Sequence, residues 1–120
     1  MKITVIGCGR WGSLITWYLD RQGHRVTLYG RDGSRHMQAF LDTRQNDLLT
    51  LPESVELSTD LGEAVRDAEV LILAVASQGL RGLMAELKPL GLKNRAFCLC
   101  MKGIEMESGK RLSEIVRENT

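Results

Sequence analysis

The sequence lacks a charge excess of either sign. Its 120 residues include 16 Lys and Arg against 15 Asp and Glu, which gives a formal net charge of +1. Because the charges are interspersed, the sequence predicts no basic face that could neutralise nucleic-acid phosphates or anionic lipid headgroups. We therefore expect neither nucleic acid nor a membrane surface as a partner.

Long apolar runs are also missing. The longest, Val70–Ala76, is far shorter than the ~20 residues that span a bilayer. No apolar secretory segment follows Met1 and Lys2, so we expect a cytoplasmic protein without membrane insertion. A length of 120 residues is typical of one domain and too short for a complete two-domain enzyme, and 43% hydrophobic with 26% charged residues is typical of a folded globular chain.

Cysteine is scarce, with three residues in the chain. Cys98 and Cys100 are separated by one residue within an apolar run, where the alternation of a strand puts both on the same face. The pair has no nearby cluster of His or further Cys and does not match a zinc pattern. We expect buried, reduced packing residues, no structural disulfide and no metal site.

What the sequence does have is a regular alternation of strand and helix patterns. Short β-branched runs at residues 3–6 and 25–29 each end at a glycine. Residues 13–22 between them form a helical pattern whose apolar side chains are expected to face inward, namely Leu14, Ile15, Tyr18 and Leu19. Gly23 follows as the left-handed residue beyond the helix end. These segments predict a strand–helix–strand unit.

The pattern continues along the chain. Further helices are predicted at residues 34–44 with Met37, Phe40 and Leu41 inward, after a cap at Asp60, after a cap at Ser77 with Leu80, Leu83, Met84 and Leu87 inward, and at 111–118. Further strands are predicted at residues 55–57, 70–75 and 96–101. The nearly all-apolar run at 70–75 is typical of a central parallel strand that is covered on both faces.

This succession predicts one α/β domain over residues 1–120, a Rossmann-type doubly wound, mostly parallel sheet with helices on both faces. The usual order places the first strand centrally, the second and third on one side, and the fourth and fifth on the other. Ligands of such sheets bind at the carboxyl ends of the strands, where the order reverses. Residues 7–12, 74–77 and 101–103 should meet at that edge.

A glycine-rich loop opens this crevice. Gly7, Gly9 and Gly12 spell GxGxxG between the first strand and a helix, which is the context that indicates a dinucleotide-binding loop. The three glycines serve a tight turn, close backbone approach to a pyrophosphate, and close packing of helix on strand. A phosphate would then lie on the free N–H groups of the helix. The alternative is that the glycines serve packing alone.

Two tryptophans lie in or after this loop. Trp11 is either a hydrophobic lid that packs on the neighbouring helix or a flat wall beside the cofactor. Trp17, on the first helix, is expected to pack, with a partner surface as the alternative.

Five segments carry a family resemblance: GCGRWG at 7–12, GHRVTLYGRD at 23–32, AVASQ at 74–78, ELKPL at 86–90 and MKGIE at 101–105. Over essentially all 120 residues the chain resembles the N-terminal half of bacterial glycerol-3-phosphate dehydrogenase. The resemblance implies reversible hydride transfer between NAD(P)H and dihydroxyacetone phosphate, giving sn-glycerol 3-phosphate, a phospholipid precursor. It also implies that the proton-transferring lysine belongs to a second, helical domain. We therefore expect no catalytic residue in this chain, cofactor binding without turnover, and leave a homodimer of the full-length protein open.

Cofactor choice is predicted from the end of the second strand. Gly30 stands where an NAD-specific unit has the Asp or Glu that binds the ribose hydroxyls. Arg31, the next residue, has a planar cation suited to the 2′-phosphate of NADPH. We therefore expect NADPH to bind at least as tightly as NADH. The alternatives are that Arg31 is a solvated turn residue, that Asp32 pairs with it, or that Asp32 reaches the ribose.

Three more residues are candidates for the site. Lys102 follows the last strand at the crevice edge, and the family motif favours contacts with the substrate oxygen or phosphate and with the nicotinamide side of the cofactor over a plain surface position. Ser77 is expected to cap a helix, with cofactor contact as the lesser alternative. Arg10 either strengthens pyrophosphate binding or is solvated.

The sequence departs from the family at several positions. Ala is usual where this chain has Cys8, a small or polar residue where it has Arg10, and Pro where it has Ala76, and the segment around Pro52 is shorter. Two rival functions stay open. One is a ketopantoate-reductase-like NADPH oxidoreductase, which usually has a lysine after the fourth strand, and the other is a non-enzymatic nucleotide-sensing module.

Overall fold

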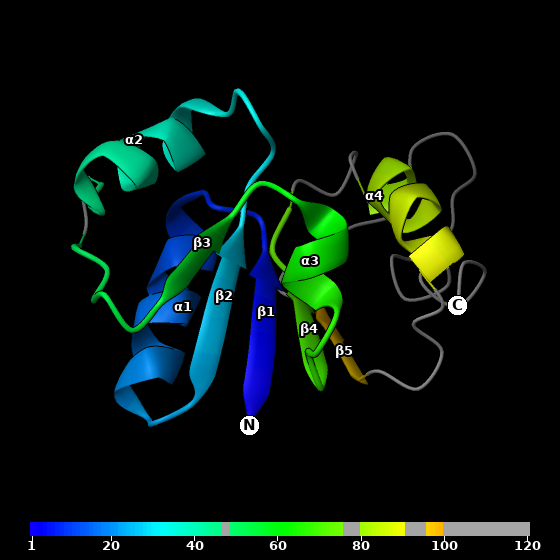
Figure 1. The fold of residues 1–120 in the computed structure, drawn as a ribbon, viewed down its shortest axis with the longest axis horizontal. Coiled ribbons are helices and arrows are strands. Elements are labelled where there is room, and N and C mark those ends of the chain that lie inside the picture. Colours follow the sequence, from blue (N-terminus) through cyan, green and yellow to red (C-terminus); the bar gives the residue numbers. More distant parts are fainter. Residues whose placement is uncertain (47–48, 76–79, 91–95, 100–120) are drawn as a thin grey trace.

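The computed structural model describes residues 1–46, 49–75, 80–90 and 96–99, which form one twisted sheet with helices on both sides (Figure 1). All neighbouring strands are parallel, in the order β3-β2-β1-β4-β5, as the sequence predicts. The strands are β1 (Lys2–Ile6), β2 (Arg25–Tyr29), β3 (Glu56–Ser58), β4 (Val70–Leu73) and β5 (Ala96–Leu99).

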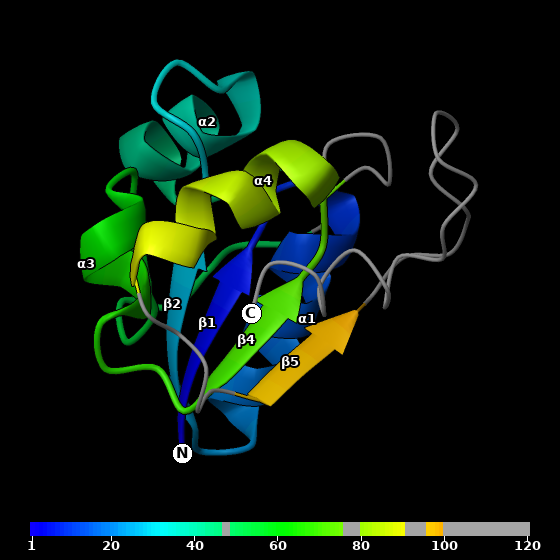
Figure 2. The same cartoon turned by 90° about the vertical axis from the view of Figure 1, so that its right-hand side faces the viewer.

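The described helices follow the predicted segments. They are α1 (Arg10–Arg21), α2 (Arg35–Thr43), α3 (Leu61–Val65) and α4 (Leu80–Leu87), the last continued by a 3-10 turn, η2 (Lys88–Leu90). In Figure 2, α4 lies in front of the sheet and α1 behind it. No helix in the described part of the chain combines the length and apolarity that crossing a membrane requires.

The sheet is buried between two apolar layers because successive side chains of each strand point to opposite faces. Ile3 and Val5 of β1 pack with residues of α2 and the segment before β3. Ile6 and the buried Leu71 and Leu73 of β4 pack with α3 and α4 on the other face. Residues of β4 are thus covered on both sides, which confirms the prediction of a central strand.

Helix α1 approaches the sheet most closely through small and polar residues, while Ile15 and Leu19 of the predicted apolar stripe pack against the core. Gly12, Ser13 and Thr16 are buried, whereas Leu14 and Tyr18 are 41% and 56% exposed. The hydroxyls of Ser13 and Thr16 donate to carbonyl oxygens of their own helix at 3.0 and 2.8 Å. They can be buried because these hydrogen bonds satisfy them. The inward placement predicted for Leu14 and Tyr18 is therefore wrong.

Two predicted caps are confirmed. The Asp60 side chain accepts a hydrogen bond from the Glu63 N–H at 3.1 Å at the start of α3. Gly23, just beyond α1, has a φ of +92° and donates its N–H to the Asp20 carbonyl at 3.0 Å. Glycine adopts this left-handed conformation without strain, so the helix ends there.

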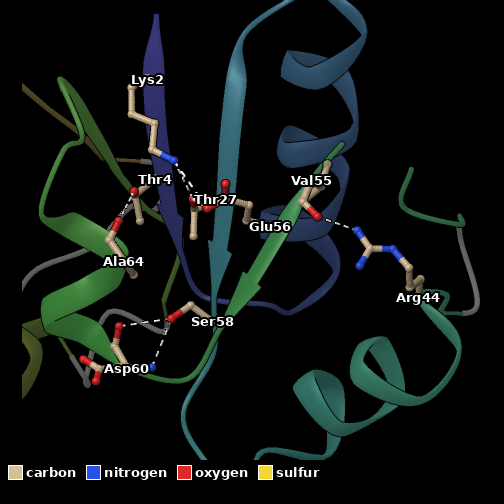
Figure 3. A network of polar contacts seen from close by, with 9 residues as sticks. All are labelled: Lys2, Thr4, Thr27, Arg44, Val55, Glu56, Ser58, Asp60 and Ala64. Atoms are coloured by element: carbon tan, nitrogen blue, oxygen red, sulfur yellow. Dashed lines mark hydrogen bonds and ion pairs between the residues drawn. The ribbon is translucent and has the colours of Figure 1, made fainter. Parts of the chain in front are cut away.

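Arg44 holds the loop between α2 and β3. It is a left-handed residue after α2, with a φ of 59°. Its guanidinium donates to the carbonyl of Leu51 at 3.3 Å, of Pro52 at 2.6 Å and of Val55 (Figure 3). One guanidinium thus joins three carbonyls of the loop and fixes the loop against the core, where Leu51 and Val55 are buried.

Polar contacts also tie strands to one another and to α3 (Figure 3). The buried Thr4 hydroxyl in β1 donates to the Ala64 carbonyl in α3. The Lys2 ammonium donates to the Thr27 hydroxyl at 3.0 Å and lies 3.6 Å from the Glu56 carboxylate. Three neighbouring strands and one helix are thereby connected at side-chain level.

Two further predictions about burial are wrong. Cys98 is exposed. Phe97 beside it packs against the cluster that includes α3 and α4, and strand alternation turns Cys98 to the opposite face of β5, which is the last strand at one edge of the sheet. Leu41 on α2 is 50% exposed. Cys100, the end of the fifth predicted strand at Met101 and the predicted helix at 111–118 lie outside the described residues.

Candidate functional site

A pocket of about 420 Å³ lies at the carboxyl ends of β1, β2 and β4. This is the edge at which the sequence predicts the ligand crevice, and the strand order reverses there on either side of β1. The pocket is lined by Ile6, Gly7, Cys8, Gly9, Tyr29, Gly30, Arg31, Ser34, His36, Ala74, Val75 and Leu83. Segments after β1, β2 and β4 therefore meet at this pocket together with α4.

Two glycines of the loop are required by the protein itself. Gly7 has a φ of +117°, and a Cβ there would lie 2.3 Å from the Ala74 carbonyl oxygen. A Cβ on Gly12 would lie 1.7 Å from the Gly7 carbonyl oxygen. Any side chain at either position would push α1 or the loop away from the sheet. The turn and packing roles predicted for these two glycines have a direct steric cause.

Gly9 is different. It has an extended conformation, with φ −72° and ψ −166°, that any residue adopts. No described atom would lie within 4 Å of a Cβ at this position, and Gly9 lines the pocket. Nothing within the described fold explains a glycine here. The space in front of Gly9 fits a molecule that approaches the backbone closely.

The amino end of α1 adjoins the same space. Gly9 is its N-cap and supplies no side chain to accept from the first N–H groups, and the first turn carries no acidic residue. A helix start has a partial positive charge and free N–H donors, which favour an anion such as a phosphate. The pocket therefore combines a side-chain-free approach with an anion-binding helix end.

Gly30, directly after β2, is tightly packed against two sulfur-containing side chains. A Cβ on Gly30 would lie 2.6 Å from the Cys8 sulfur, 2.8 Å from the Met37 Cε and 2.9 Å from the Met37 Cβ. Cys8 is buried, and its sulfur lies 3.6 Å from the Ser34 hydroxyl. Burial raises the pKa of the Cys8 thiol above its ordinary value of 9.0, so the thiol stays protonated at neutral pH.

Arg31 extends from the loop after β2 to α4. Its Nη2 lies 3.2 Å from the Glu86 Oε2, and the two side chains are 64% and 48% exposed. The carboxylate that contacts Arg31 among the described residues is thus Glu86, whereas the sequence offered Asp32 as a partner. Burial raises the pKa of the neighbouring Tyr29 phenol, the Glu86 charge raises it further, and Arg31 opposes this.

The other candidates are placed as follows. Arg10 is the first residue of α1 and is exposed. Trp11 is 68% exposed, so its interpretation as a lid packed on a helix is wrong. Trp17 packs against the core and stacks under the Arg21 guanidinium, 4.9 Å from the ring centroid. Ser77 and Lys102 lie outside the described residues.

Sequence reasoning missed several pocket residues. Ser34 and His36 enter from the start of α2, and Leu83 enters from α4. Ser34 carries a signal, because it caps α2 directly after the β2 loop and its hydroxyl accepts from the Met37 N–H at 3.4 Å. Leu83 has the spacing of an ordinary core residue, so no sequence signal marks it as a pocket residue. No group of His, Cys, Asp or Glu that could hold a metal ion is found among the described residues.

Together, the parallel sheet, its strand order and the glycine-rich loop at the carboxyl edge define a Rossmann-type dinucleotide-binding domain. The family model described as the N-terminus of NAD-dependent glycerol-3-phosphate dehydrogenase matches residues 2–120. The chain belongs to this family. The match favours this family over the ketopantoate-reductase-like alternative.

Individual relatives agree with the family match. A glycerol-3-phosphate dehydrogenase (NAD(P)+) from Thermoanaerobacter sp. (strain X514) is 36% identical over 98% of this chain and 36% of its own length. The protein of the same name from Streptomyces coelicolor is 39% identical over 97% of this chain and 35% of its length. A crystal structure of glycerol-3-phosphate dehydrogenase from Coxiella burnetii superposes with a TM-score of 0.87 at 23% identity, covering 98% of this chain and 37% of that chain. The chain thus spans about a third of the length of these relatives.

Proposed function

We propose that this chain binds NAD(P)H in the pocket at the carboxyl ends of β1, β2 and β4, with the pyrophosphate over Gly9 and the start of α1. As part of a longer protein, it would serve hydride transfer between NAD(P)H and dihydroxyacetone phosphate, giving sn-glycerol 3-phosphate. The observation that carries the proposal is that a Cβ at Gly9 would meet no described atom, so the described fold does not require a glycine there. The bound nicotinamide ring supplies or accepts the hydride.

The chain's own residues have distinct roles in this proposal. Gly7 and Gly12 let the loop turn and let α1 approach β1. Arg10 adds a cation beside the pyrophosphate, and Trp11 is an exposed flat wall next to the cofactor. Arg31 lies at the pocket and faces the adenosine 2′-phosphate, so that NADPH binds at least as tightly as NADH.

Other parts of the proposal rest on the sequence and the family resemblance. Lys102 would contact the substrate and the nicotinamide side of the cofactor, and Ser77 would cap the helix beside the same edge. The proton-transferring lysine would come from the remainder of a longer protein. The 120 residues would then bind cofactor without turnover. A cytoplasmic location and a homodimer of the longer protein are predictions of the same kind.

The Gly9→Val substitution tests the proposal. The branched side chain would occupy the space of the diphosphate, so we expect affinity for NADH and NADPH to fall at least about 100-fold, or ~2.7 kcal/mol. The free energy of unfolding should stay within about 0.5 kcal/mol of the parent because the position is open. Calorimetric titration and thermal unfolding measure both quantities.

The matched control is Gly82→Val in α4, where a Cβ also has open space but which does not line the pocket. This variant should bind both cofactors as the parent does. If folded Gly9→Val binds with unchanged affinity, the pyrophosphate does not lie over the loop and the proposal is wrong.

A further inference from the structure

The ion pair between Arg31 and Glu86 bridges two parts of the pocket that are far apart in sequence. Arg31 lies just after β2, and Glu86 lies 55 positions later on α4. Leu83, one turn before Glu86 on the same helix, lines the pocket, as does Arg31. The pair therefore lies beside the adenosine end of the proposed cofactor site and connects its two walls.

The same guanidinium has two uses in this arrangement. In the structure its Nη2 lies 3.2 Å from the Glu86 carboxylate. A 2′-phosphate that binds Arg31 would have to share this cation with Glu86 or displace it, and the carboxylate would repel the phosphate. NADH has a neutral hydroxyl in place of the phosphate and meets neither penalty. The Glu86 charge should therefore weaken the binding of NADPH and leave the binding of NADH nearly unchanged.

We propose that Glu86 is a specificity-determining residue, which competes with the cofactor 2′-phosphate for Arg31 and so keeps the preference for NADPH over NADH small. The inference rests on the proposed cofactor site. Both side chains are about half exposed or more, so water and salt weaken the pair, and the competition is modest. Tyr29 and Arg31 both line the pocket, so the pair with Glu86 begins at the pocket wall.

The test is a titration of the full chain with NADPH and with NADH. Glu86→Gln keeps the shape of the side chain and removes its charge. We expect NADPH affinity to rise about three- to fivefold at low salt, as for the loss of one exposed ion-pair competitor. NADH affinity should change less than about twofold, and the NADPH gain should shrink as salt rises, because exposed charges are screened.

Two further variants make the result specific. Glu63→Gln on α3 removes the same charge from another exposed glutamate and should leave both affinities unchanged. In an Arg31→Ala background, Glu86→Gln should raise NADPH affinity by less than about half of its effect in the parent, because the contested cation is gone.

The outcomes separate the inference from the proposed function. If the parent binds neither cofactor, the proposed function fails. If the parent binds both but Glu86→Gln leaves the NADPH to NADH ratio unchanged, or shifts both affinities equally, the role of Glu86 is refuted while the cofactor site stands. Thermal unfolding of each variant confirms that the titrated protein is folded.

Discussion

Replacing Gly30 by alanine is predicted to destabilise the protein. The added Cβ would lie 2.6 Å from the Cys8 sulfur and 2.8 and 2.9 Å from the Cε and Cβ of Met37. Met37 is 1% exposed and Cys8 is 6% exposed, so both side chains belong to the packed layer, and at least Met37 must shift within it. Overpacking of this kind costs about 1–3 kcal/mol, and loss of glycine freedom in the unfolded chain offsets about 0.5 kcal/mol.

The expected net loss is therefore about 0.5–2.5 kcal/mol, which lowers Tm by roughly 2–10 °C. Thermal and urea unfolding of Gly30→Ala measure it. Gly82→Ala on α4 is the control, because its Cβ meets open space and should stabilise the helix by about 0.5–1 kcal/mol. If Gly30→Ala is as stable as the parent, the packing around Gly30 is looser than these distances indicate, and the steric reasoning is wrong.

A double mutant locates the clash. Cys8→Ala removes the sulfur that lies nearest to the added Cβ. Gly30→Ala should therefore destabilise the Cys8→Ala background by about 1 kcal/mol less than it destabilises the parent. Equal losses in both backgrounds would assign the whole clash to Met37.

The remaining predictions concern four parts of the chain. Arg44→Ala should cost about 2–3 kcal/mol of unfolding free energy, because three carbonyls lose a charged donor. Asp60→Ala should cost about 1 kcal/mol through the lost α3 cap, and both are measured by urea unfolding. Native alkylation with iodoacetamide, mapped by mass spectrometry, should label exposed Cys98 and spare buried Cys8 until unfolding. The pKa of the Cys8 thiol is raised above 9.0 in the folded state, so near and above this pH the folded state binds more protons than the unfolded state. The free energy of unfolding should therefore fall as pH rises further, and Cys8→Ala should reduce this fall. In a longer protein with activity, Lys102→Met should lower kcat/KM at least about tenfold, or ~1.4 kcal/mol, and unchanged kinetics would remove Lys102 from the site.

Strands and their order could be predicted because apolar β-branched runs and right-handed crossovers leave few topologies. The predicted strand at 25–29 agrees with β2. The start of α1 could not be placed from periodicity, since the helix begins at Arg10 within the glycine motif. Its buried face holds Ser13 and Thr16, because the close approach at Gly12 leaves no room for larger side chains. That approach is a tertiary contact that hydrophobic spacing does not record.

The candidate site could be predicted in part. GxGxxG and the predicted strand order locate the pocket edge from the sequence, because the glycine spacing has a local mechanical cause. The partner of Arg31 could not be predicted, because Glu86 is 55 positions away and its spacing on α4 is that of any exposed helix residue. Asp32 was the nearest carboxylate in sequence, but the structure brings α4 closer in space.

The tight packing at Gly30 and the exposed position of Arg31, both directly after β2, are related. A residue that binds the ribose hydroxyls is usual at the end of this strand, yet Cys8 and Met37 fill the space that a side chain would need at Gly30, directly after β2. In the proposed cofactor site, selection between NADH and NADPH would then depend on the next residue, Arg31, which is 64% exposed. The exposed Arg31 guanidinium can pair with a nearby anion, and in the structure it pairs with Glu86 of α4. Under this proposal, packing at Gly30 would move cofactor choice from a rigid strand end to the exposed Arg31–Glu86 ion pair, where a single charge change would shift it.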